Sequence, residues 1–122
     1  MMLYELGEVV AERQMNAFAE DGGCTQVVVK IGKPQPDTLG AGQDWYCPHQ
    51  ILGLGREGVE ATFGVDSLQA FLLGVHRLQL ELAKRAQDAS VRLDWLGQPD
   101  LGLKVDPEVH KLIPPSAGGM GT

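Results

Sequence analysis

The chain has 122 residues, of which 43% are hydrophobic, and its formal net charge is −6. One soluble domain with its own core is the expectation for this length and composition. No apolar run approaches the roughly 18 residues that a membrane span requires. An acidic protein repels phosphate backbones and anionic lipids, so we expect neither a nucleic-acid partner nor a membrane partner.

The first two predicted elements form a hairpin. Residues 7–18 alternate between apolar and polar positions, and residues 25–32 ("TQVVVKIG") do so with a high content of β-branched side chains. The "EDGG" turn at residues 20–23 joins them. Residues 33–43 contain two prolines and two glycines, which predicts a long loop.

A second hairpin is predicted over residues 44–63. Residues 44–54 read as the third strand and residues 59–63 as the fourth, with the "GREG" turn between them. Pro48 lies inside the third strand. Since proline cannot donate to a strand ladder, we expect this strand to lie at an edge of the sheet or to be bulged at Pro48.

The pattern then changes to the period of a helix, predicted over residues 66–88. Asp66 is the expected N-cap, and Gln69 completes a capping box. A last strand is predicted over residues 90–97. The apolar stripe of the helix recurs at steps of three and four, at Leu68, Phe71, Leu72, Val75, Leu78, Leu82 and Ala86.

This order of elements predicts an α+β fold, a mostly antiparallel sheet of about five strands with one long helix packed on one face. We assign residues 1–105 to this single domain. Residues 106–122 are predicted to be an irregular C-terminal segment and a disordered tail.

The "WYCPH" stretch carries the first candidate site. On a regular strand Trp45, Cys47 and His49 share one face. A metal needs three or four converging ligands. Only Cys24 and His76 suggest themselves as additions, and no spacing requires them, so we expect no metal and no cofactor. The sequence favours Cys47 as a buried core residue.

Two alternatives keep chemistry at this strand. In one, Cys47 and His49, with His76, line a small-molecule or metal-binding pocket between sheet and helix. In the other, the protein is an enzyme with Cys47 as nucleophile and His76 as its base. No signal peptide opens the sequence, so we expect a cytoplasmic protein with two free thiols.

Two pairs of apolar residues are candidates for contact with a partner. Trp45 and Tyr46 follow the long loop, an arrangement common in recognition surfaces, although Trp45 would equally suit a cap on the core. Leu73 and Leu80 lie seven residues apart and off the main stripe. They are ordinary exposed leucines, a homodimer contact, or are covered by the chain after Gly97.

Four short motifs resemble a small uncharacterised bacterial family, a domain of unknown function. They are Ile-Gly-x-Pro at 31–34, Trp-x-Cys-Pro at 45–48, Ile-x-Gly-x-Gly at 51–55 and Gly-Val-Asp-Ser-Leu-Gln-Ala at 64–70. The resemblance covers roughly residues 7–97 and implies a compact α+β domain, with no activity attached. The residues themselves favour a non-catalytic protein-binding module, of an interaction or immunity-like kind, for a basic partner.

Overall fold

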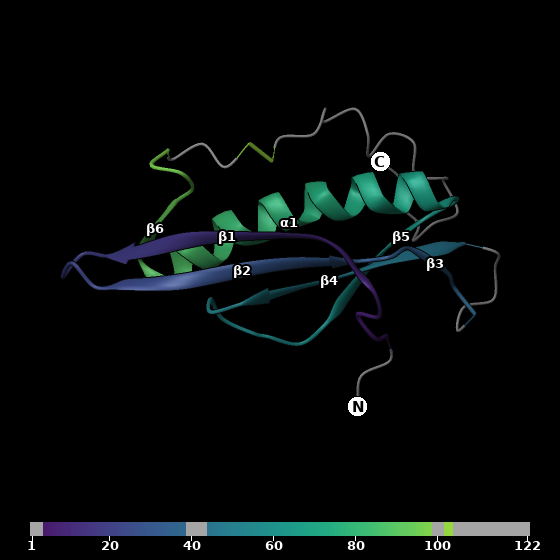
Figure 1. Cartoon of the computed structure of the whole chain (residues 1–122), viewed down its shortest axis with the longest axis horizontal. Coiled ribbons are helices and arrows are strands. Elements are labelled where there is room, and N and C mark those ends of the chain that lie inside the picture. Colours follow the sequence, from purple (N-terminus) through teal and green to yellow (C-terminus); the bar gives the residue numbers. More distant parts are fainter. Residues whose placement is uncertain (1–3, 39–43, 99–101, 104–122) are drawn as a thin grey trace.

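The computed structural model describes residues 4–38, 44–98 and 102–103, and Figure 1 shows one helix lying over a curved sheet. The predicted α+β class is confirmed. The elements in chain order are β1 (Val9–Ala19), β2 (Cys24–Gly32), β3 (Gln35–Pro36), β4 (Trp45–Leu52), β5 (Glu60–Gly64), α1 (Ser67–Ala89) and β6 (Val91–Asp94). Among the elements of the described residues, the two-residue strand β3 was not predicted from the sequence. The predicted C-terminal segment, residues 106–122, lies outside the described residues.

All strand pairings are antiparallel, and β1 and β2 form the predicted hairpin, with Phe18 opposite Cys24. Strand β4 pairs with β2 and β3 along one side and with β5 along the other. Strand β6 pairs with the far side of β1. The chain therefore leaves β5 at one edge of the sheet and returns as β6 at the other, with α1 as the crossing element.

Pro48 lies in an internal strand, so the predicted edge position is wrong. The pairing partners of β4 explain why the sheet tolerates it. His49 pairs with Ile31 of β2, whereas Tyr46 pairs with Gln35 of β3. The sheet is interrupted between β2 and β3, opposite Pro48, and the missing N–H of the proline falls at this interruption. The alternative expectation, a bulge at Pro48, is also wrong, because β4 keeps an unbroken register with β5 through Cys47, Pro48 and His49.

The helix α1 begins as predicted at the N-cap Asp66, whose carboxylate accepts a hydrogen bond of 2.7 Å from the Gln69 N–H. The Gln69 side chain accepts the Val65 N–H at 2.7 Å, one residue earlier than a capping box requires. The buried face of α1 is rotated relative to the predicted stripe. Leu68 is 65% exposed. The buried residues are Gln69, Ala70, Leu73, Gly74, Leu78, Leu82, Arg85 and Ala86.

The core lies between α1 and one face of the sheet. Its strand residues alternate in sequence, as a one-sided sheet requires, and include Met15, Val27, Cys47, Ile51 and Leu93. The opposite face is polar over β1 and β2, where the exposed Gln26 side chain donates to Gln14 at 3.1 Å.

The N-terminal segment covers the other end of this polar face. Its Leu6 carbonyl lies so close to Gly32 that no side chain would fit at that position. The Lys33 N–H donates to the Glu8 carbonyl at 2.8 Å, which holds the segment against the sheet.

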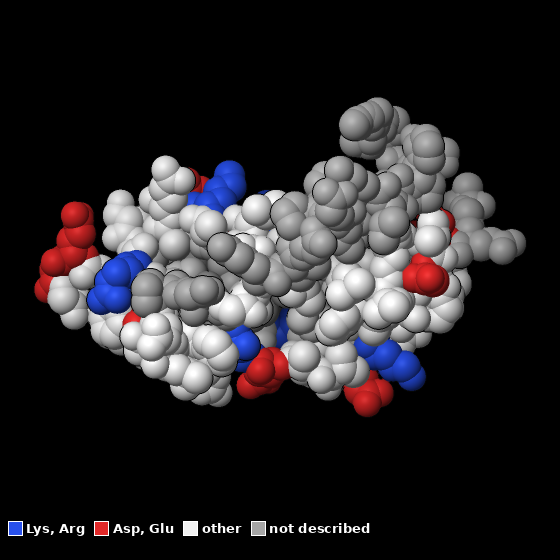
Figure 2. Space-filling model, turned by 90° about the horizontal axis from the view of Figure 1, so that it is seen from above, with Lys and Arg blue, Asp and Glu red and all other residues white. Residues whose placement is uncertain are grey.

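Charged side chains do not form one continuous patch on the face seen from above. They stand in small separate groups of both signs between uncharged residues (Figure 2). Among the described residues, no helix is long and apolar enough to cross a bilayer. Leu73 is 5% exposed and Leu80 is 58% exposed, so the two leucines do not form one exposed surface. The predicted dimer contact through both of them is untested.

Candidate functional site

Cys47 and His49 point to the same face of β4, as the alternation predicts, and α1 packs directly over them. Cys47 is fully buried, and His49 is 2% exposed. The helix approaches through Gly74, where a side-chain Cβ would stand 3.2 Å from Cys47 Sγ and 3.8 Å from His49 Cδ2. The strand therefore places this pair in the core, under a helix that leaves no open space above the thiol.

The Cys47 thiol is held in its protonated form. Burial raises its pKa to about 11. Its Sγ donates weakly to the carbonyls of Gly32 and Pro48, at 3.9 Å and 4.0 Å. A nucleophilic or metal-binding cysteine needs its thiolate, which neighbouring cations or a helix N-terminus stabilise. The surroundings of Cys47 favour the opposite state.

His49 is held in its neutral form. Burial lowers its pKa to about 4, with a further lowering from the positive charges of Arg77 and Arg85 and an opposing effect of Glu81. Its Nε2 shares a hydrogen bond of 2.8 Å with the Thr62 hydroxyl on the neighbouring strand. A neutral histidine with a fixed partner and a dry environment is typical of a structural residue.

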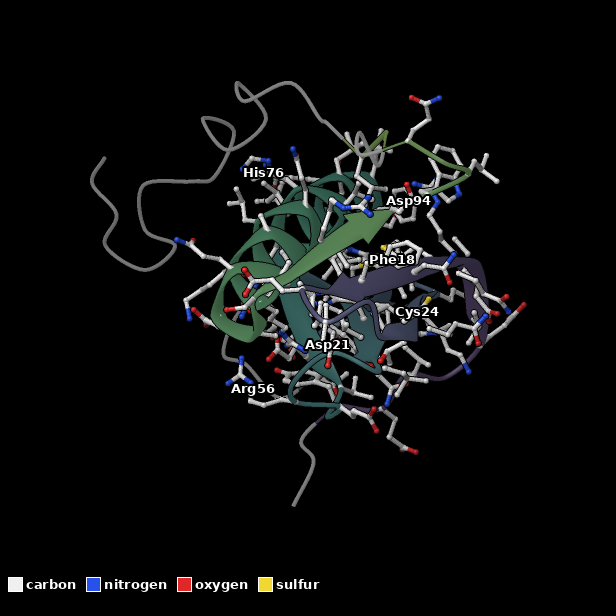
Figure 3. The ribbon with its side chains drawn as sticks, turned by 90° about the vertical axis from the view of Figure 1, so that its left-hand side faces the viewer. Phe18, Asp21, Cys24, Arg56, His76 and Asp94 are labelled. Atoms are coloured by element: carbon white, nitrogen blue, oxygen red, sulfur yellow. The ribbon has the colours of Figure 1, made fainter. Side chains whose placement is uncertain are left out.

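His76 lies on the outer side of α1 (Figure 3), away from Cys47 and His49. The helix presents Gly74 to Cys47, and residues two positions apart on a helix do not face the same way. The structure thus brings Cys47 and His49 together without His76. Cys24, the other thiol, is exposed at the start of β2. Within the part of the chain that the structure describes, no three His, Cys, Asp or Glu side chains are grouped to hold a metal ion.

An aromatic cluster occupies the opposite face of the sheet, at the end where β4 begins. We use this name for Tyr4, Tyr46 and Phe63. The rings of Tyr4 and Tyr46 are 4.6 Å apart and tilted by 56°, and those of Tyr4 and Phe63 are 5.6 Å apart and edge to face. Phe63 is 43% exposed, and the two tyrosines are half-buried. Tyr46 is thus part of a surface, whereas Trp45 packs against the core on the other face.

Carboxylates adjoin the aromatic cluster. The Tyr4 hydroxyl donates to Asp37 at 3.1 Å. Burial raises the pKa of Tyr4, and the Asp37 carboxylate raises it further, so this hydroxyl stays a donor. The Asp37 N–H donates to the Asp44 carbonyl at 2.8 Å, which places a second acidic residue beside the first. Glu5, exposed, follows Tyr4 in the chain.

Sequence reasoning found Tyr46 but missed Tyr4, Phe63 and Asp37. Phe63 could have been found, because it alternates with the core-facing positions of its strand. Nothing in the sequence indicates that the N-terminal segment folds back to bring Tyr4 to Tyr46. Likewise, no local pattern brings Asp37 to the ring of Tyr4.

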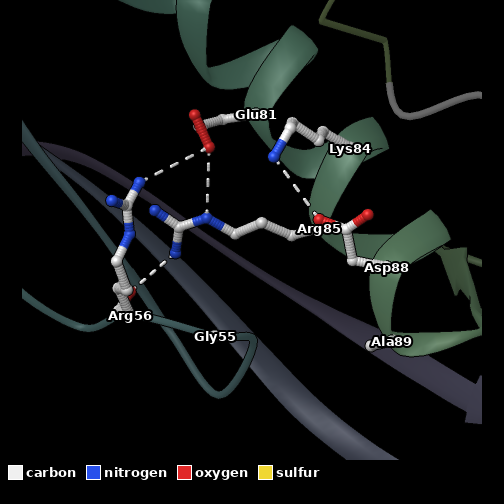
Figure 4. A pocket seen from close by; sticks show the side chains of 7 residues that line it. All are labelled: Gly55, Arg56, Glu81, Lys84, Arg85, Asp88 and Ala89. Carbon is white, nitrogen blue, oxygen red and sulfur yellow. Dashed lines mark hydrogen bonds and ion pairs between the residues drawn. The ribbon is translucent and has the colours of Figure 1, made fainter.

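A concave region, separate from the aromatic cluster, lies between α1 and the turn after β4 (Figure 4). It measures about 340 Å³ and is lined by residues of both charges, including Arg56, Lys84 and Asp88. Arg85 crosses its base and donates to the carbonyls of Leu54 and Arg56, at 3.0 Å and 2.6 Å. Glu81 and Glu60 balance Arg85 at 3.4 Å and 3.7 Å. These contacts fix the turn to the helix and leave the region without a dominant charge.

Together these features define, over the described residues, an α+β domain with one long helix, whose Cys–His pair belongs to the core and whose aromatic cluster belongs to the surface. The chain belongs to the family described as domain of unknown function (DUF6968), whose model matches residues 11–105. This match begins and ends further along the chain than the expected 7–97. No curated protein and no solved structure matched the chain.

Proposed function

We propose that this domain is a non-catalytic protein-binding module that takes a basic partner on the aromatic cluster of Tyr4, Tyr46 and Phe63. The observation that carries the proposal is the contact of three partly exposed rings beside the Asp37 carboxylate. Aromatic side chains supply much of the energy of protein interfaces, and they stay mostly rigid when a partner binds. A cluster of contacting rings has already lost the freedom that binding would otherwise remove.

The expected partner is basic for two reasons. The chain carries a net charge of −6, which attracts cationic proteins and speeds their association. The Asp37 carboxylate lies beside the cluster and favours lysine or arginine side chains there, and Asp44 is a second acidic residue held next to Asp37 through its backbone carbonyl. The faces of tyrosine and phenylalanine rings also attract such cations. This proposal includes a bacterial origin and a cytoplasmic location for the protein, as expected from the sequence.

The alternatives centred on Cys47 receive less support. A small-molecule or metal site would require open space or further ligands beside Cys47 and His49, and Gly74 closes the space above the thiol. An enzyme with Cys47 as nucleophile would require a stabilised thiolate, whereas burial raises the pKa of this thiol to about 11. The shared face of Cys47 and His49 fits the pocket alternative, but the burial of both side chains weighs against either alternative.

The test compares proteins retained by immobilised variants of the full chain. Phe63→Lys adds a positive charge to the cluster, Tyr46→Ala removes a ring, and Leu80→Ala is the control because Leu80 is an exposed leucine outside the cluster. We expect one basic protein to be retained by the wild type and by Leu80→Ala, released by salt, and lost in both cluster variants. Equal retention by all four proteins would reject the proposal, as would an organic ligand or metal seen by native mass spectrometry and lost in His49→Ala.

A further inference from the structure

The turn that follows β6 holds a leucine in a conformation that leucine rarely adopts. Trp95 and Gln98 exchange two backbone hydrogen bonds of 2.9 Å, so Leu96 and Gly97 form a two-residue turn. Their φ angles are 54° and 78°. Positive φ at both central positions is the pattern of a type I′ turn, which favours Asn-Gly. Leucine has a Cβ that disfavours this region, so the backbone at Leu96 is strained.

Among the described residues, the Leu96 side chain gains little burial that would compensate for this strain. It is 79% exposed, the largest value among the large hydrophobic side chains that the structure describes as exposed. Strained backbone conformations persist where the surrounding structure enforces them, and they concentrate at functional positions. An apolar side chain held out at the tip of a tight turn is suited to enter a hollow on another surface.

An apolar hollow of this kind lies on the same molecule, where α1 leaves the sheet uncovered. The helix packs chiefly on β4, β5 and β6. Over β1 and β2 a hollow of about 120 Å³ remains, and the residues that line it include Ala11, Glu12, Arg13, Ile31, Val75 and Leu103. Since an apolar cavity of about 150 Å³ holds a benzene molecule, a hollow of this size admits a leucine side chain.

The turn and the hollow are neighbours on one surface. Arg13 lines the hollow, and its guanidinium carbon lies 3.6 Å from the centre of the Trp95 ring, next to Leu96 in the chain. The rim of the hollow carries Glu12 and Arg13, one charge of each sign. Two copies can therefore approach here without local like-charge repulsion, despite the negative charge of the whole chain.

We propose that the occupant of the hollow is a second copy of this chain, in a symmetric dimer in which Leu96 of each copy enters the hollow of the other. A two-fold interface requires that one surface carry both complementary features, and the adjacency of Leu96 and the hollow meets this condition. This surface differs from the predicted contact through Leu73 and Leu80, because Leu73 is buried within the chain. It also shares no residue with the aromatic cluster.

The oligomeric state tests the proposal, measured by light scattering over a wide concentration range with the full chain. Leu96→Asn removes the side chain, and Ala11→Leu fills the hollow from its exposed rim. We expect a wild-type dimer and a dissociation constant raised about tenfold or more in both variants, with Leu80→Asn unchanged. Leu96→Asn should at the same time raise the Tm of the dilute monomer, because asparagine tolerates positive φ.

The change in the Tm of the monomeric Leu96→Asn variant separates two roles of Leu96. If the fold needed this leucine, its replacement would lower the Tm, whereas a leucine that only contacts a partner would not have this effect. A pair of introduced thiols then tests the geometry. In a Cys24→Ser background, the double variant Ala11→Cys with Leu96→Cys should give a covalent dimer on oxidation. Peptide mapping of that dimer should find position 11 joined to position 96. A wild type that is monomeric throughout, assemblies that grow beyond the dimer, or a dimer indifferent to Leu96→Asn or Ala11→Leu would overturn the proposal.

Discussion

Gly74 of α1 lies directly over Cys47 of β4. A Cβ placed on Gly74 would stand 3.2 Å from Cys47 Sγ and 3.5 Å from Cys47 Cβ. Gly74 therefore has no side chain at the point where the sulfur atom of Cys47 occupies the space between helix and strand. A glycine within a helix is unfavourable by itself, so packing against Cys47, and not helix propensity, explains the small residue at this position.

We predict that the effect of Gly74→Ala depends on the residue at position 47. In the wild type, overpacking against the buried sulfur outweighs the gain in helix propensity, and the free energy of unfolding falls by about 1 kcal/mol. In a Cys47→Ala background the same change raises it by about 1 kcal/mol. Urea denaturation of the four proteins of this double-mutant cycle measures the coupling, and additive effects would show that the two residues are not packed as described.

The two thiols should differ in reactivity. Cys24 is exposed, whereas Cys47 is buried and its pKa is raised to about 11. Near neutral pH, iodoacetamide should add one label to the native chain, at Cys24, and a second only after denaturation. Intact mass spectrometry with peptide mapping follows the labels. Rapid stoichiometric labelling of Cys47 in the native protein would revive the enzyme alternative.

His49 should make the fold sensitive to mild acid. Its pKa is about 4 in the folded chain and 6.5 in an unfolded one, so protons bind the unfolded state more tightly. The stability linked to neutral His49 is fully present above the unfolded pKa and is lost as the pH falls from about 6.5 towards 4. By about pH 5 the loss should reach about 2 kcal/mol.

Denaturation of wild type and His49→Gln at a series of pH values measures this loss. The comparison isolates the histidine, because the carboxylates of the chain are the same in both proteins. We expect the difference in unfolding free energy to narrow by about 2 kcal/mol between about pH 7 and about pH 5. Parallel curves over that range would mean that the His49 ring is not buried in its neutral form.

Arg85 should be required for the turn that joins β4 to β5. Its guanidinium donates to the carbonyls of Leu54 and Arg56, and it is 9% exposed. Removal leaves the buried Leu54 carbonyl without its donor and leaves Glu81 with the longer contact to Arg56 at 4.0 Å, so Arg85→Ala should lower the unfolding free energy by about 3 kcal/mol. The matched control is Lys84→Ala, whose side chain pairs with Asp88 at the surface and should matter little. Similar losses in both variants would contradict this role of Arg85.

Local patterns in the sequence predict most of the fold. Alternation over β1 and β2 gives the hairpin, and the acid at position 66 gives the start of the helix. The face that α1 buries is harder to predict from the sequence, because the apolar pattern of a helix does not reveal a buried glycine or a buried arginine. Gly74 turns inward to admit Cys47, and Arg85 turns inward to bind the carbonyls of a turn. Each reason depends on a contact between residues far apart in the chain.

The aromatic cluster was likewise predictable only where a local sequence pattern determines it. The outward direction of Tyr46 follows from the inward direction of Cys47, which the strand pattern gives. The ring of Tyr4 reaches Tyr46, a partner far along the chain, only because the N-terminal segment folds over the end of the sheet. Similarly, the edge position expected for Pro48 failed because the interruption between β2 and β3 is a property of pairing, which the proline alone does not reveal.

The crossing of α1 from one edge of the sheet to the other has a consequence for the order of assembly. Each pairing among β1 to β5 joins strands that are consecutive or one strand apart in the chain, whereas β6 pairs with the first strand, β1, with Val91 opposite Ala19. Closing this large loop carries a greater entropic cost, so β6 should join last and open first. Amide protons of β6 should then exchange faster than those of β2, and the turn at Leu96 would be presented or withdrawn as this strand docks and releases.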